Sequence, residues 1–131
     1  MADEAAFGGA DWAAGLADAY GDLPASDGAT AVVEHTGTGG PDGAVVYWTA
    51  FEDGRLVAAG AGHHADPTVT MTSPYTLAAQ LATGAADPSV TFMQGRIKVA
   101  GDQAALLRVL AVMATPAYRA ATARVADRTA A

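Results

Sequence analysis

The chain has 131 residues, a formal net charge of −7 and no cysteine. Without cysteine it cannot form disulfides, thiolate nucleophiles or thiolate metal ligands. No apolar run approaches the roughly 18 residues of a membrane span, and the acidic start MADEAAFGG lacks the basic and apolar regions of a secretion signal. We therefore expect a cytoplasmic protein with a single domain over residues 1–131. One Lys against six Arg, with abundant Ala and Gly, is typical of a bacterial chain from a GC-rich genome.

Charge is divided unevenly along the chain. Residues 1–53 contain ten Asp and Glu and no Lys or Arg, whereas residues 54–131 contain all seven bases and four acids. This asymmetry predicts either attraction between the two halves within the fold or a dipolar surface that orients the protein on a partner. An acidic chain without a basic, aromatic-rich stripe is not expected to bind nucleic acid.

Large aliphatic residues are scarce. Leu, Ile, Val and Phe make up 23 of the 131 residues, a share low enough for disorder to be considered in a charged chain. Regular periodicity and helix-capping signals favour a folded domain, with Ala supplying much of the apolar surface and with frayed ends at residues 1–10 and 128–131.

The first half of the chain is predicted to form one helix followed by strands. Trp12, Leu16 and Tyr20 recur at steps of four, which indicates one face of a helix over residues 11–20. Segments rich in β-branched, aromatic or alternating residues then predict four strands, at 29–35, 44–51, 55–60 and 68–72. The glycine-rich segment 36–43 is predicted to be a loop. The Asp-Gly dipeptide after the second strand predicts a primed hairpin turn.

The segment TGAADPSVTFMQGRIKVAGD, residues 83–102, is the most informative part of the chain. Gly84 is predicted to end a helix, because glycine readily takes the left-handed conformation that follows a helix C-terminus. Asp87-Pro88 then starts another helix, since the carboxylate accepts from first-turn amides and proline lacks an N–H that would have no partner there. Each boundary in this segment therefore has a stereochemical reason.

The same signals predict the remaining elements. Ser73-Pro74 starts the helix that precedes this segment, and Gly95 ends the short helix within it. Polar and apolar residues alternate over 96–99, which predicts a strand. Two further helices start after capping residues, one after Asp102 and one after Thr115.

A short strand between two capped helices, with Phe92-Met93 beside it, resembles the sterol carrier protein 2 family of non-specific lipid-transfer domains. In that family a helix ends in Gly, an Asn- or Asp-Pro pair starts the next one, and an aromatic pair, Gln-Gly, Lys-Leu-Lys and Gly-Asn or Gly-Asp follow. This chain matches the pattern at Gly84, Asp87, Pro88, Phe92, Gln94, Gly95, Lys98, Gly101 and Asp102. The resemblance is specific over residues 66–114 and looser over 11–65, and Met93 stands where a second aromatic residue is common.

The order of elements and the resemblance both imply an α+β fold. We expect about five strands in a mostly antiparallel sheet with helices packed on one face. The resemblance adds an apolar tunnel between the sheet and the helices, and indicates a small stand-alone member of bacterial type.

Similar domains bind fatty acids, acyl-CoA, phospholipids or sterols in this tunnel, so the resemblance implies binding and transfer of a hydrophobic small molecule. Carried onto this chain, it implies an apolar lining of Trp48, Leu77, Leu81, Phe92, Met93, Leu106, Leu110, Met113 and Tyr118. Gln94 is either a polar contact in the tunnel or a helix cap. The implied partners are the ligand and, transiently, a membrane or an acceptor enzyme. No cofactor or metal is expected, and the chain is expected to be a monomer or a weak dimer.

Two other functions stay open. One is an enzyme acting on a hydrophobic metabolite, with His63, His64 or Asp66 as acid or base. Neighbours in a strand point to opposite faces and no third ligand is close in sequence, so a solvated loop is expected here rather than a metal site. The other is an interaction module whose interior is filled by its own side chains or by a partner's helix, with the acidic half as docking face. Because no catalytic motif stands out, we expect a binding protein rather than an enzyme.

Overall fold

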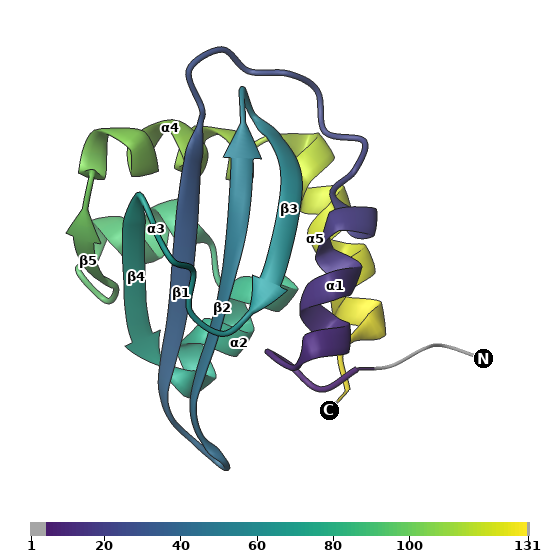
Figure 1. Cartoon of the computed structure of the whole chain (residues 1–131), viewed down its shortest axis with the longest axis vertical. Helices are drawn as coiled ribbons and strands as arrows, with labels where there is room; N and C mark the ends of the chain where they lie inside the picture. The colour runs from purple at the N-terminus through teal and green to yellow at the C-terminus, as the bar shows by residue number, and fades with distance from the viewer. Residues whose placement is uncertain (1–4, 131) are drawn as a thin grey trace.

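Residues 5–130 are described by a computed structural model, and they form one sheet covered by helices (Figure 1). This part of the chain contains the strands β1 (Ala31–Gly40), β2 (Gly43–Glu52), β3 (Arg55–Ala61), β4 (Val69–Pro74) and β5 (Lys98–Gly101). Its helices are α1 (Ala10–Ala19), α2 (Tyr75–Thr83), α3 (Pro88–Met93), α4 (Gln103–Met113) and α5 (Pro116–Arg128). The α+β architecture predicted from the sequence is confirmed.

The strands lie side by side in the order β3-β2-β1-β4-β5. Every neighbouring pair is antiparallel except β1 and β4, which run parallel. Parallel neighbours need a long connection, and here β2, β3 and the loop before β4 supply it. The sheet is therefore mostly antiparallel, as predicted.

The β1–β2 hairpin reaches further into the glycine-rich segment than predicted. β1 continues to Gly40 and β2 begins at Gly43, so most of the expected loop over 36–43 is strand. The two strands pair up to Gly40 and Gly43, after a shift in register beyond Gly37. Glycine has a weak strand preference, but the backbone bonds to the partner strand are available to any residue and outweigh it.

The later helix starts have the side-chain caps that the sequence predicts. The carboxylates of Asp87 and Asp102 accept from first-turn amides at 3.1 and 3.0 Å, and the Thr115 hydroxyl accepts from one at 3.3 Å. Each bond satisfies an N–H that the helix itself leaves unpaired. Gly84, with a φ of 84°, ends α2 in the left-handed conformation.

Two boundaries differ from the prediction. α2 begins at Tyr75 without a side-chain cap, because β4 continues to pair with β1 as far as Pro74. β5 begins at Lys98 rather than Arg96, since Lys98 is where pairing with Thr72 of β4 starts. In both cases the partner strand sets the boundary, and the local sequence does not encode it.

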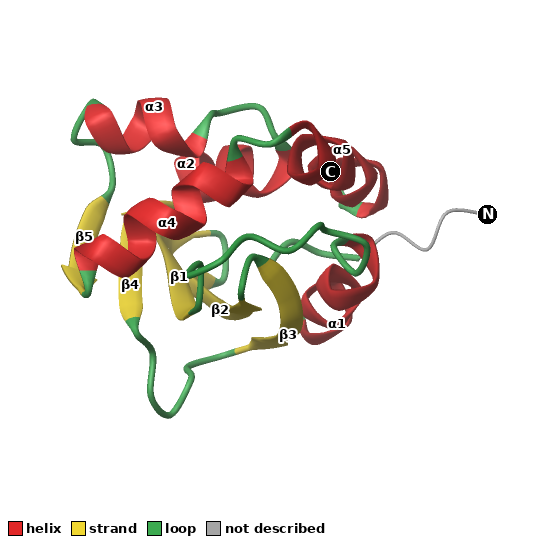
Figure 2. Ribbon diagram, turned by 90° about the horizontal axis from the view of Figure 1, so that it is seen from above, coloured by secondary structure: helices red, strands yellow, loops and turns green. Residues whose placement is uncertain are grey.

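Helices α2 to α5 lie over one face of the sheet, whereas the connection from β3 to β4 runs on the other side (Figure 2). α1 lies beside β3 and packs against α5. The close approach of α2 to β1 depends on Gly37, because a Cβ there would lie 2.9 Å from the Cβ of Ala78. The core lies between sheet and helices, where Val33, Leu106 and Val109 are fully buried.

The two ends of the described chain are bonded to each other. The Ala5 N–H donates to the Arg128 carbonyl at 2.8 Å, and the Ala130 N–H donates to the Ala5 carbonyl at 2.8 Å. Phe7 is buried in the core. Backbone hydrogen bonds thus join the described parts of the two ends, the fraying of residues 1–10 and 128–131 stays a prediction, and residues 1–4 and 131 lie outside the described range.

Within residues 5–130 no single helix is long and apolar enough to cross a membrane. α4 and α5, bent by 80° at the break between them, meet that test only as a pair, on length and composition alone.

Candidate ligand-binding site

The sheet presents different side chains to its two faces, because successive residues of a strand point in opposite directions. His35 of β1 lies opposite Tyr47 of β2, and both border the space under the helices together with Thr49. Glu34 and Trp48, the neighbours of that pair, lie opposite each other on the outer face. The candidate site therefore lies on the helix-facing side.

Aromatic side chains occupy much of the space between the sheet and the N-terminal segment. The ring centroid of Trp12 lies 5.0 Å from that of Phe7 and 4.8 Å from that of Tyr47, both in edge-to-face geometry. Tyr47 stacks on His35 with centroids 4.4 Å apart and planes inclined by 5°. Such pairs contribute about 0.5–1.5 kcal/mol each beyond the burial of their area, so they fix one wall of the site.

A cavity of about 40 Å³ remains between these rings and the helices. His35, Tyr47 and Thr49 line it from the sheet, and Tyr20 and Tyr118 line it from the helical side. Its apolar lining includes Trp12, Leu16, Met71, Leu81, Pro88 and Met113. A water molecule needs about 10–15 Å³ of such space, so the cavity in this state has room for a small group of one to a few heavy atoms.

The sheet end of this cavity is polar but uncharged. Nε2 of His35 lies 3.0 Å from Oγ1 of Thr49, and the ring tautomer decides which of the two donates. Burial lowers the pKa of His35 to about 4, because the imidazolium would lose its hydration there. At neutral pH the ring is therefore neutral and carries one donor and one acceptor nitrogen.

Two stacked tyrosines, Tyr20 and Tyr118, close the helical side, with ring centroids 4.5 Å apart. The Tyr20 hydroxyl lies 2.7 Å from that of Thr122, which itself donates to the Tyr118 carbonyl, so Tyr20 donates to Thr122. Burial raises the pKa of Tyr20, Tyr47 and Tyr118, since each phenolate would lose its hydration. All three are neutral phenols at physiological pH.

An open groove of about 290 Å³ adjoins the cavity beside α5 and the connection from α2 to α3. Leu81, Pro88, Met113 and Tyr118 line both spaces, so these four side chains form the common wall between them. The groove continues over small residues, among them Ala123 of α5. Cavity and groove are therefore neighbours, separated only by this shared wall.

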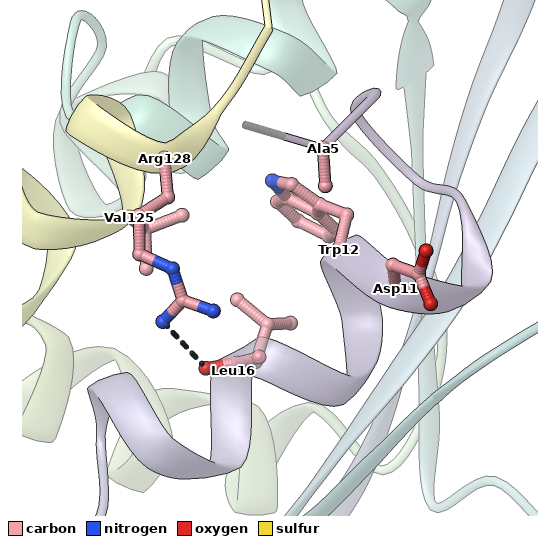
Figure 3. Close-up of a pocket in the computed structure, with 7 residues that line it drawn as sticks. Ala5, Asp11, Trp12, Leu16, Val125 and Arg128 are labelled. Carbon is pink, nitrogen blue, oxygen red and sulfur yellow. Dashed lines mark hydrogen bonds between the residues drawn. The ribbon is translucent and has the colours of Figure 1, made fainter. Parts of the chain in front are cut away.

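A second groove, of about 370 Å³, lies between α1 and α5 (Figure 3). Arg128 reaches from α5 toward α1 and donates to the Gly15 carbonyl at 3.4 Å, and Arg124 donates to the Ala19 carbonyl at 2.8 Å. Ala19 is the last residue of α1, and carbonyls at a helix C-terminus carry partial negative charge, so Arg124 complements that end of α1. More of its exposed lining is polar than apolar, the reverse of the first groove, so it suits an apolar ligand less well.

The structure brings only part of the predicted lining together. Leu81, Met113 and Tyr118 border the cavity. Three further residues are buried in the interior but are not part of the cavity lining, namely Leu77, Leu106 and Leu110. Phe92 is half-buried and packs against the core from α3.

Trp48 and Met93 do not lie where the prediction placed them, and of the two roles predicted for Gln94 the structure shows the helix cap. Trp48 is on the outer face, with its ring edge-to-face against His64 at 4.8 Å, because strand alternation gives the inward position to Tyr47. Met93 is 85% exposed at the end of α3. Gln94 is exposed and forms the C-cap of that helix through its backbone N–H.

The histidines considered as acid or base lie away from the cavity, on the outer side of the sheet. Nδ1 of His63 is 3.2 Å from a Glu34 carboxylate oxygen, and the His64 N–H donates to the other oxygen at 2.9 Å. The Asp66 N–H donates to Nδ1 of His64 at 2.9 Å. These bonds fasten the β3–β4 connection to the sheet. Over residues 5–130, no group of three or more His, Cys, Asp or Glu side chains is placed to hold a metal ion.

The sequence did not identify the aromatic and polar part of the lining. Trp12, Leu16 and Tyr20 do stand out as a helix face, but that pattern fits ordinary core as well as a cavity wall. His35 and Thr49 lie in predicted strands, and which face they occupy depends on a strand register that the local sequence leaves open.

Comparison with known proteins agrees with this fold. The model of the SCP-2 sterol transfer family matches residues 19–114, which is most of the chain. The chain therefore belongs to the SCP-2 sterol transfer family. A search of the curated proteins found no match.

Several solved structures have a similar fold. A crystal structure of sterol carrier protein 2 gives a TM-score of 0.68 at 15% identity, covering 95% of this chain and 99% of that one. A conserved hypothetical protein from Thermus thermophilus has a TM-score of 0.67 at 15% identity, covering 96% of both chains. Palmitated sterol carrier protein 2 like 2 from Aedes aegypti has a TM-score of 0.59 at 15% identity, covering 80% of this chain and 89% of that one. At this identity the similarity establishes the fold.

Proposed function

We propose that this protein binds a hydrophobic small molecule between its sheet and the helices α2 and α5, and transfers it to a membrane or an acceptor enzyme. The candidate ligands are those the family suggests, namely a fatty acid, an acyl-CoA, a phospholipid or a sterol-like molecule. The observation that carries the proposal is the apolar groove that adjoins the interior cavity across a shared wall. The palmitated form of the Aedes aegypti protein, which has the same fold, supports it.

Entry of a ligand requires the shared wall to move. Met113 is the most adaptable part of this wall, because an unbranched thioether side chain has several rotamers of similar energy. Burying on the order of 400 Å² of ligand at ~25 cal/mol/Å² offers roughly 10 kcal/mol before costs. Lost motion and wall opening take several kcal/mol of this, which leaves dissociation constants in the micromolar to nanomolar range.

The two alternatives have weaker support. The enzymatic one relied on His63, His64 and Asp66, which lie across the sheet from the cavity. The interaction module with a filled interior agrees with the small volume of the cavity, and the experiment below separates it from a carrier. The cytoplasmic location, the bacterial origin and the monomeric or weakly dimeric state stay predictions.

Native mass spectrometry of gently purified protein, before and after organic extraction, tests the proposal. We expect a mass excess that extraction removes and that palmitate restores. The variant Ala123→Trp should reduce palmitate binding at least tenfold, because the indole fills a groove position on the exposed side of α5. The matched variant Ala120→Trp, also exposed on α5 but outside the groove lining, should bind like the wild type. A bare mass that persists after incubation with palmitate and mixed lipids would contradict a carrier function and favour the interaction module.

A further inference from the structure

The sheet end of the cavity is more polar than an alkyl chain needs. The inward positions beside it, Val33 and Phe51, are apolar, whereas His35, Tyr47 and Thr49 carry hydrogen-bonding groups into the cavity. Burying such groups costs free energy unless they have partners. His35 and Thr49 satisfy part of this requirement through each other at 3.0 Å. A single bond between a neutral imidazole and a hydroxyl still leaves hydrogen-bonding capacity for a guest.

The same surface is unsuited to a charged guest. The described lining of the cavity contains no Lys or Arg. His35 is uncharged at neutral pH, because burial lowers its pKa to about 4. A carboxylate placed there would be a buried charge without a counter-ion, which is strongly unfavourable. A hydroxyl or a carbonyl oxygen meets no such penalty.

The two volumes fit a ligand that enters with its oxygen first. The cavity of about 40 Å³ accommodates a hydroxyl-sized group, and the adjoining groove of about 290 Å³ accommodates an apolar body. A fatty acid would have to lie the other way round, with its carboxylate outside. There it would meet Arg119, which is at the groove and pairs with Asp87 at 3.2 Å. That arrangement would leave the polar end of the cavity facing a methyl group.

We infer that the ligand is an uncharged oxygenated lipid, a long-chain alcohol or ketone, whose oxygen is held by His35 and Thr49 while its apolar body lies in the groove. This inference rests on the proposed function and narrows it to one chemical class. The two residues recognise the ligand by hydrogen bonding, and the groove contributes affinity without selecting for chain identity.

The test compares dodecan-1-ol with dodecanoate on delipidated protein, with tryptophan fluorescence, to which Trp12 at the cavity contributes, as the reporter. We expect the alcohol to bind about tenfold more tightly than the acid. Thr49→Val keeps the shape of the side chain and removes its hydroxyl, and should weaken alcohol binding about fivefold, the value of one net hydrogen bond. His35→Phe keeps an aromatic ring to stack on Tyr47 but removes the ring nitrogens, and it should weaken alcohol binding by a similar factor.

The matched control is Thr70→Val, the same change on the outer face of β4 opposite Ala100, which should leave both affinities unchanged. If His35→Phe fails to fold, the ratio of the two probe affinities in the wild type and the affinity of Thr49→Val for dodecan-1-ol still test the inference. Equal or tighter binding of dodecanoate, or a Thr49→Val variant that behaves like Thr70→Val, would overturn the inference while the carrier function stands. Binding of neither probe would overturn the proposed function itself.

Discussion

The two faces of the sheet come from alternating residues of the same strands, and a histidine on each side shows how different they are. His35, under the helices, is bonded to a neutral hydroxyl and has its pKa lowered to about 4 by burial. His63, on the outer side, is 75% exposed and lies beside the carboxylate of Glu34. The helices cover only one face, so the chemistry of a residue here depends on its position relative to that cover more than on its type.

The alternation of side chains between the two faces also accounts for the main misplacement in the predicted lining. Trp48 and Tyr47 are adjacent and both aromatic, yet only Tyr47 borders the cavity. A shift of one residue moves a side chain through the sheet to the other face. The aromatic wall of the site is therefore defined by strand register.

The largest effect expected from this difference is a dependence of stability on pH. The pKa of His35 is about 4 in the folded protein and about 6.5 when unfolded, so between these values the unfolded state binds a proton that the folded state does not. Stability should therefore fall as pH falls, with this residue contributing a loss of about 2 kcal/mol between pH 7 and pH 5. Urea unfolding at both pH values checks this, with His35→Phe as control. An equal loss of stability between pH 7 and pH 5 in the wild type and in His35→Phe would show that His35 does not titrate in this way.

A pair of adjacent valines on β1 provides a matched test of the two faces. Val33 is fully buried under the helices, whereas Val32 is half-buried on the outer side. Val33→Ala removes two methyl groups from a packed site and should cost about 2 kcal/mol of unfolding free energy, against less than about 1 kcal/mol for Val32→Ala. Denaturant unfolding of both variants measures the difference. Equal losses would mean that the outer face is covered as well.

The smallest effect is expected for the outer cluster. Glu34→Gln keeps a carbonyl oxygen that can accept from the His64 N–H but loses the charge beside His63. Because His63 is largely exposed, solvent screens this pair, and the loss of stability should stay below about 1 kcal/mol and shrink in high salt. Denaturant unfolding at two salt concentrations measures it. A loss above about 2 kcal/mol would place the outer cluster on a par with the covered face.

Most helix boundaries, though not the start of α2, were predictable because their causes are local. Asp87, Asp102 and Thr115 each cap an amide three residues further along, and Gly84 needs only its own left-handed conformation. These signals were sufficient for the fold class and for the resemblance to the family. The hairpin in the glycine-rich segment 36–43 was not predictable in this way, because its pairing involves a second strand.

The sequence alone thus determined most of the helix starts and ends, the α+β class and the family. Only the tertiary structure decided which residues line the cavity. Its key contacts join residues far apart in the chain, such as His35 with Thr49 across 14 positions and Tyr20 with Thr122 across 102. A cap is an interaction within one turn, whereas a cavity wall depends on strand register and on which face the helices cover, and both arise only when the whole chain packs.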